Sequence, residues 1–324
     1  MNTKGRKIGS TIIKIGILLL VLWVVYRKIN DKSKLEEFDF LLSQLGSETI
    51  ASTIFWLVLL MFTNWLLECV KWQYLCKPIE AISFYRSFES VFCGLSWAIF
   101  TPNRIGEYGG RVLFLKPKKR VFGVVAMAVG AFAQLVITNI MGTVALIWFV
   151  STYEKLSLGW YLLFCLAAFI FIAGLLLLYF RIRLLNQWIG KIRWLAKVQR
   201  FFHLLERYTT QQLTTVFLLS ALRFIVFTSQ YAFIMQVLLT ELPMLPMFMM
   251  VFLLFFIQSA IPSLDLLDVG VRSLTASFLF AYLTKQELAI MASTAAIWFI
   301  NLIVPAIIGS VFVFKINFFG NPDR

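Results

Sequence analysis

The sequence predicts an all-α polytopic membrane protein, and three observations support this prediction. Of its 324 residues, 60% are apolar and only 14% are charged, with a mean hydropathy of +0.84. The apolar residues gather in segments long enough to cross a bilayer, and most basic residues lie in short stretches between them. Soluble domains carry about 25% charged residues. This composition therefore excludes a secreted soluble enzyme, a disordered chain, a collagen and a disulfide scaffold.

Six segments have the roughly 20 mostly apolar residues that a transmembrane helix needs. They cover residues 8–26, 49–69, 121–150, 158–180, 210–239 and 287–314. The first follows basic residues, as a signal peptide does. However, the first alanine is Ala51, so no A-x-A cleavage site follows, and we expect a retained span.

Two further apolar stretches are each interrupted near the middle. Residues 81–115 are interrupted around Pro102, and residues 244–284 around Pro262, with glycines following in both cases. Each stretch is long enough for two half-membrane helices at about 1.5 Å per residue. The sequence therefore predicts about six full spans plus two re-entrant broken-helix hairpins.

The basic residues predict the orientation. With the N-terminus in the cytoplasm, the inner segments hold 18 Lys and Arg residues and the outer segments hold 6. This bias predicts a multi-pass protein of the cytoplasmic (inner) membrane with both termini inside. It also accounts for the net charge of +14 without a nucleic-acid partner. The amphipathic segment 181–207 predicts an interfacial helix, or a docking site for a soluble partner.

The two interrupted stretches share a pattern that predicts an internal repeat. Acid-x-Gly-x-Arg-x-Leu occurs at 107–113 and again at 268–274, and residues 52–62 match 214–224 at five of eleven positions. In the predicted topology these copies run in opposite directions, which indicates an inverted repeat. We expect one integral-membrane domain over residues 1–324. Within it, the first span and an outer loop occupy 1–48, and the first repeat occupies 49–157. A span followed by a cytoplasmic amphipathic helix occupies 158–209, and the second repeat occupies 210–324.

Several polar residues are predicted at membrane depth, where each charge must face protein or water. The candidate substrate-binding residues are Asn103, Arg104, Glu107, Arg111, Arg223, Asp265, Asp268 and Arg272. One interpretation is structural, because Glu107–Arg111 and Asp268–Arg272 have the i, i+4 spacing of helix ion pairs. The other is an anion site, because Arg outnumbers acid at the first hairpin and Arg223 has no acid in its own helix. The two aspartates would then bind a cationic group or carry a proton.

The sequence contains none of the common nucleotide-binding, hydrolase or metalloprotease motifs. We therefore predict no catalytic residue, no metal site and no cofactor. Asp265 and Asp268 are the one carboxylate pair with a plausible catalytic spacing, and such a pair could hold Mg²⁺ for phosphoryl or glycosyl transfer.

The segment from Thr101 to Glu107, followed by Arg111, is similar to a signature of one membrane family. This is the lysylphosphatidylglycerol synthase transmembrane-region family, which includes the flippase half of the multiple peptide resistance factor. Its signature resembles Thr-Pro-Gly-Arg-Ile-Gly-Glu followed by Arg, and Asn103 replaces the Gly here. The resemblance implies a stand-alone member, without a synthase domain, that moves lipids across the bilayer. At the second hairpin the family pattern Pro-x-Pro-Gly-Gly-x-Gly is absent, so we do not carry over lysylphosphatidylglycerol as the substrate.

Together these observations predict a lipid flippase in which a polar cavity between the two hairpins admits an anionic or zwitterionic head group. The expected partners are membrane lipids, either an anionic phospholipid or a polyprenyl phosphate, and a membrane-associated lipid-modifying enzyme is a candidate partner. Two alternatives remain open. One is an intramembrane enzyme acting on a polyprenyl or phospholipid phosphate, and the other is a membrane partner of a glycosyltransferase or synthase.

Overall fold

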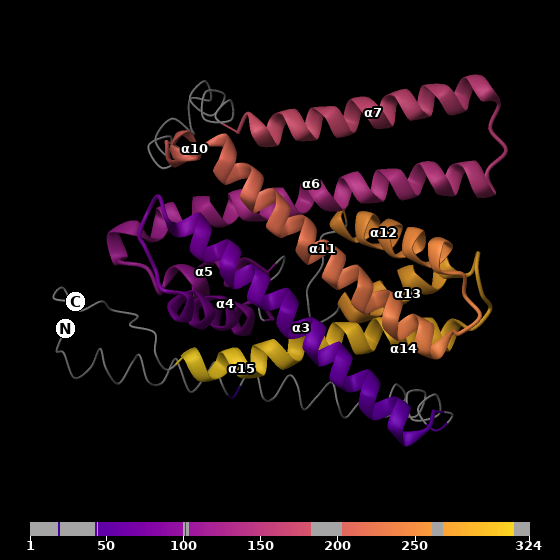
Figure 1. The fold of residues 1–324 in the computed structure, drawn as a ribbon, viewed down its shortest axis with the longest axis horizontal. Helices are drawn as coiled ribbons and strands as arrows, with labels where there is room; N and C mark the ends of the chain where they lie inside the picture. The colour runs from indigo at the N-terminus through magenta and orange to yellow at the C-terminus, as the bar shows by residue number, and fades with distance from the viewer. Residues whose placement is uncertain are drawn as a thin grey trace.

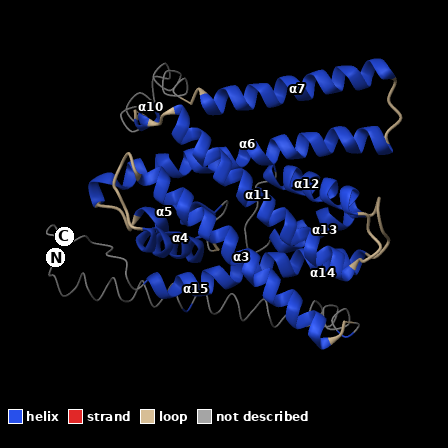
Figure 2. Ribbon diagram, in the orientation of Figure 1, coloured by secondary structure: helices blue, strands red, loops and turns tan. Residues whose placement is uncertain are grey.

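The computed structural model describes residues 45–99, 104–182, 203–260 and 268–313, together with positions 19, 43 and 101. Every regular element in these ranges is helical (Figure 2). The elements are α3 (Ser47–Cys76), α4 (Phe84–Ala98), α5 (Ile105–Val112), η2 (Pro117–Lys119), α6 (Arg120–Tyr153), α7 (Leu158–Phe180), α10 (Leu204–Arg207), α11 (Thr210–Leu238), α12 (Met244–Ala260), α13 (Asp268–Phe280), α14 (Glu287–Trp298), η4 (Phe299–Ile303) and α15 (Val304–Val313). The predicted first span 8–26 and most of the amphipathic segment 181–207 lie outside the described residues.

Five helices are long and apolar enough to cross a membrane. They are Ser47–Cys76, Pro117–Tyr153, Leu158–Phe180, Thr210–Leu238 and Glu287–Val313, and they match five of the six predicted spans. The exposure of α7 is the clearest sign of a lipid environment, because only Ala168 and Tyr179 of its 23 residues are buried. A helix that is apolar on all sides and exposed on most of them is stable in a bilayer and not in water. The chain is therefore an all-helical, multi-pass membrane protein.

Helix α3 runs to Cys76, past the predicted end at residue 69. The predicted span 49–69 leaves Lys71 in the cytoplasmic segment that follows, and this is wrong, because Lys71 lies within α3 with only 2% of its side chain exposed. The physical reason is an ion pair with Glu68, one turn earlier. A neutralised charge inside the protein does not end a transmembrane helix as an unpaired charge would.

Each interrupted stretch forms two helices that pack against each other, with the predicted break between them. In the first, Ser83 caps the start of α4, since its hydroxyl accepts a hydrogen bond from the backbone N–H of Arg86. Helices α4 and α5 then approach closely, because a Cβ on Gly110 would lie 2.6 Å from the Cα of Gly94. Only glycine allows this separation, and the glycines after the break therefore close the hairpin.

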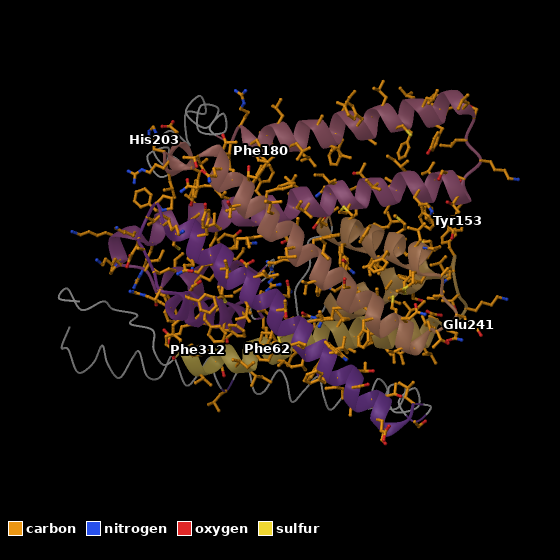
Figure 3. All side chains as sticks on the ribbon, viewed as in Figure 1. Phe62, Tyr153, Phe180, His203, Glu241 and Phe312 are labelled. Carbon is orange, nitrogen blue, oxygen red and sulfur yellow. The ribbon has the colours of Figure 1, made fainter. Side chains whose placement is uncertain are left out.

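Helices α3 and α11 lie side by side and run in opposite directions through the centre of the molecule (Figure 1). Helix α4 of the first hairpin packs against α15, and α12 of the second hairpin packs against α6. The buried apolar residues form two main groups, one around α3, α4 and α6 and one around α11, α12 and α14. The connections lie at two opposite ends, with His203 and Phe312 at one and Tyr153 and Glu241 at the other (Figure 3). The hairpins thus occupy opposite ends of one helical bundle.

Candidate functional site

A buried carboxylate, Glu68 of α3, holds three cations from three positions in the sequence. Its Oε2 lies 2.7 Å from Lys71 Nζ and also pairs with Arg223 Nη1, while its Oε1 lies 2.6 Å from Arg111 Nη1. The side chains of Lys71 and Arg111 are 2% and 3% exposed. Removing one partner of such a buried pair leaves an uncompensated charge, which costs about 3–5 kcal/mol. Glu68 therefore joins α3, α5 and α11 at one point.

A second carboxylate, Glu107 of α5, extends this network. It pairs with Arg111, as the i, i+4 spacing predicted, and with Arg104 at 3.1 Å. We define the charge cluster as Glu68, Lys71, Arg104, Glu107, Arg111 and Arg223. Its four cations exceed its two carboxylates by two positive charges. Such an excess inside an apolar bundle favours an anion nearby.

Arg104 is held in an unusual backbone conformation at the start of α5. Its φ of 57° and ψ of 27° place it in the left-handed region, and it is the one non-glycine residue with positive φ among the described positions. This conformation costs about 1–2 kcal/mol for an L-residue. Thr101 supports it, since its hydroxyl accepts a 2.6 Å hydrogen bond from the backbone N–H of Gly106. From this position the Arg104 side chain reaches both Glu107 and the ring of Trp65.

A cavity of about 350 Å³ lies between the hairpins, next to the charge cluster. Its lining comes from α3, α5, α6, α11, α12, α13, α14 and η4, so both halves of the chain contribute. The lining residues are Asn64, Trp65, Arg104, Gln134, Thr138, Arg223, Phe224, Phe227, Tyr231, Phe255, Gln258, Ser259, Arg272, Ile297, Trp298, Asn301 and Leu302. Ligand sites in proteins commonly have volumes of about 300–1,000 Å³ and a few polar groups on an apolar wall.

Three guanidinium groups line this cavity. Those of Arg104 and Arg223 lie 5.8 Å and 5.3 Å from the ring centre of Trp65, within the range of cation–π contacts. Arg223 donates from Nε to Asn64 and from Nη1 to Glu68, while its Nη2 donates to no acceptor among the described residues. Arg272 of α13 donates a 3.2 Å hydrogen bond to Gln258 of α12. Planar guanidinium groups suit phosphate oxygens, to which they can donate two parallel hydrogen bonds.

The structure places the predicted site residues in three groups. Arg104, Arg223 and Arg272 line the cavity. Glu107 and Arg111 lie behind it, in the charge cluster. Asn103, Asp265 and the side chain of Asp268 lie outside the described residues. At the first hairpin Arg111 pairs with Glu68 of α3 as well as with Glu107, and Arg223, which has no acid in its own helix, also pairs with Glu68.

Glu68, Lys71 and Trp65 belong to the site and were not among the residues predicted from the sequence. The signal that points to Glu68 is its i, i+3 spacing from Lys71 within an apolar helix, since two charges one turn apart there must face the protein interior. Among the described residues, no group of three or more His, Cys, Asp or Glu side chains could hold a metal ion.

The comparisons with known proteins give one family. The family model described as "Lysylphosphatidylglycerol synthase TM region" matches residues 11–309. No curated protein and no solved structure matches the chain. The match covers nearly the whole sequence, including both hairpins and the charge cluster, and it is consistent with a membrane-lipid-related role. The chain therefore belongs to the lysylphosphatidylglycerol synthase transmembrane-region family.

Proposed function

We propose that this protein is a lipid translocase, and not an enzyme, in the cytoplasmic membrane. A phosphate-containing head group enters the cavity between the hairpins while the acyl or prenyl chains stay in the bilayer. The observation that carries the proposal is the convergence of Arg104, Arg223 and Arg272, from three different helices, on one cavity inside an apolar bundle. Charged side chains are costly at membrane depth and mark substrate pathways when they face a cavity.

The packing of the hairpins supports an inverted repeat. Each hairpin packs on the last helix of the other half, α4 on α15 and α12 on α6. Both contacts place a glycine against a phenylalanine: a Cβ on Gly309 would lie 1.8 Å from the carbonyl oxygen of Phe92, and one on Gly142 would lie 2.2 Å from Cβ of Phe256. Two halves whose hairpins each pack on the other half can rock against each other about a central site, as in alternating access.

The charges at the two ends of the bundle support the predicted orientation. Where α3 ends and α6 begins, the chain carries Lys77, Lys116, Lys118, Lys119 and Arg120. The opposite end carries Glu48, Glu154, Lys155, Glu241, Lys285 and Glu287. We assign the basic end to the cytoplasm. With one further span before α3, both termini then lie inside.

The test is translocation of fluorescent phospholipids and a polyprenyl phosphate in proteoliposomes. Arg272→Gln removes a cavity guanidinium that lies outside the charge cluster, and Arg86→Gln is the matched control because its half-exposed side chain lies away from the cavity. A charged hydrogen bond contributes about 1.5–3 kcal/mol, so we expect Arg272→Gln to slow translocation at least about tenfold and Arg86→Gln to leave it unchanged.

Folded protein that moves no lipid of this panel, or equal rates in wild type and Arg272→Gln, would contradict the proposal. Two further outcomes identify the alternatives. Turnover that depends on a divalent metal and on Asp265 or Asp268 indicates an intramembrane enzyme. Function that survives Arg104→Ala but needs the basic residues of 181–207 indicates a docking partner for a lipid-modifying enzyme.

A further inference from the structure

Four polar side chains on the cavity wall have a buried polar atom with no partner among the described residues. These atoms are Trp65 Nε1, Gln134 Oε1, Gln258 Nε2 and Asn301 Oδ1. Trp65 and Asn301 are 4% and 8% exposed, so both are more than nine-tenths buried. Buried polar atoms in proteins are almost always paired. Their gathering on one cavity indicates that a ligand or water completes their hydrogen bonds.

The orientation of Asn301 is fixed by a chain of hydrogen bonds. Gln230 of α11 donates from Nε2 to the carbonyl oxygen of Leu57 at 2.8 Å, so its Oε1 must face the other way and accept. That Oε1 accepts from Asn301 Nδ2 at 2.8 Å, and the same nitrogen donates to the carbonyl oxygen of Ile297. Because a backbone carbonyl can only accept, the chain cannot be reversed. Asn301 Oδ1 is therefore an acceptor on the cavity wall, carried by the π-helical turn η4.

Gln258 and Trp65 are donors for equally direct reasons. The guanidinium of Arg272 can only donate, so the oxygen of Gln258 faces it and the Nε2 group is left as a donor. The indole Nε1 of Trp65 has no other role than donation. The wall therefore offers directed donors, Gln258 and Trp65, a directed acceptor, Asn301, and the buried amide oxygen of Gln134.

A phosphate oxygen only accepts, and a primary ammonium group only donates. Hydroxyl groups do both, so a polyol is the head-group chemistry that satisfies a wall of mixed donors and acceptors. The three guanidinium groups that line the cavity would also repel an ammonium group, because their charges have the same sign. The three arginines can bind a phosphate, and hydroxyl groups beside that phosphate would form hydrogen bonds with the unpaired amide and indole atoms.

We propose that the cavity selects lipids whose phosphate is linked to a hydroxylated, uncharged group, as in a glycerol phosphate or a hexose phosphate, over lipids that carry an ammonium group. This inference rests on the proposed translocase function and names its substrate class. The phosphate meets Arg104, Arg223 and Arg272, and the hydroxyl groups meet Asn301, Gln134 and Gln258.

The experiment compares four lipids in proteoliposomes: phosphatidylglycerol, a hexosyl phosphoryl polyprenol, phosphatidic acid and phosphatidylethanolamine. We expect one or both hydroxylated lipids to move about tenfold faster than the other two, which is the effect of one or two hydrogen bonds. Which of the first two is faster identifies the source of the shared chemistry. Equal rates for all four lipids would overturn the inference.

Asn301→Leu and Gln134→Leu each remove a wall acceptor, and both should slow the hydroxylated lipids about tenfold while leaving phosphatidic acid unchanged. Gln134→Leu keeps the test decisive if Asn301→Leu fails to fold, since Gln134 Oε1 has no described partner to lose. Gln236→Leu is the matched control: its Oε1 is also buried and unpaired among the described residues, but it does not line the cavity. Equal slowing of all lipids by the wall variants would show a structural role and refute the selectivity.

Direct binding separates this inference from the proposed function. If the folded protein moves none of the lipids, the same panel is measured by native mass spectrometry with the same variants. Preferential binding of the hydroxylated lipids that Gln134→Leu removes would refute translocation and keep the substrate class. Absence of any preference would refute both.

Discussion

Glu68 of α3 and Arg223 of α11 form a buried ion pair although 155 residues separate them in the sequence. The pair lies on the contact between the two helices, and Arg223 also lines the cavity. Any change in the angle between α3 and α11 must therefore move this guanidinium relative to its carboxylate. The contact ties the geometry of the two halves to the charge that the cavity presents.

Glu68→Gln should destabilise the protein by about 3–5 kcal/mol, because Lys71, Arg111 and Arg223 lose their shared counter-ion in a buried site. Unfolding midpoints in mixed detergent micelles measure the loss. Glu48→Gln is the control, since Glu48 is exposed in the first turn of the same helix and should change stability by less than about 0.5 kcal/mol. The double variant with Arg223→Gln should recover part of the loss. Equal stability of the two Glu→Gln variants would mean that the cluster is not structural.

Gly110→Ala should destabilise the α4–α5 hairpin by about 1–3 kcal/mol, the usual cost of overpacking. The added methyl group would lie 2.6 Å from Gly94 Cα, and backbone atoms there cannot move aside. Its neighbour supplies the control, because a Cβ on Gly109 would lie 3.8 Å from the nearest atom of Trp97, an ordinary contact. Thermal unfolding in detergent compares the two variants. A Gly109→Ala variant less stable than Gly110→Ala would show that the hairpin packs differently.

Arg104→Gly should separate stability from activity. Glycine adopts the left-handed conformation of residue 104 without strain. The free energy of unfolding should therefore stay the same or rise by up to about 1 kcal/mol. Translocation should fall at least about tenfold, because one cavity guanidinium is lost. Proteoliposome transport and thermal unfolding on the same preparation measure both quantities. A loss of stability that parallels the loss of transport would indicate that Arg104 serves the fold alone.

Single cysteines at the two ends of the bundle should be labelled from opposite sides of the membrane. Lys118→Cys lies at the basic end and Lys155→Cys between α6 and α7 at the other. Native Cys69, Cys76 and Cys93 are buried, and Cys165→Ser removes the partly exposed fourth. A membrane-impermeant maleimide should label Lys155→Cys in intact cells and Lys118→Cys only in inside-out vesicles. The reverse pattern would invert the proposed orientation.

The sequence predicted the helices well, and it predicted the site in part. The interruptions between α4 and α5 and between α12 and α13 are predictable because proline and glycine interrupt a helix locally. Arg104, Arg223 and Arg272 were identified because isolated charges in apolar segments are rare. Trp65 and Asn301 were not identified, because an aromatic or amide side chain in an apolar helix has the same pattern whether it faces lipid, core or cavity.

The class of protein, the five described spans and the two hairpins are determined by the sequence, because length and local hydropathy decide which segments can cross a bilayer. The partners across the bundle were decided only by the tertiary structure. The sequence of a helix that is apolar on most sides does not predict which of its faces meets which neighbour. Contacts such as Glu68–Arg223 depend on how α3 and α11 pack against each other. For the same reason Lys71 is a buried cation and not a loop residue: a carboxylate one turn away, shared with two arginines from other helices, holds it inside.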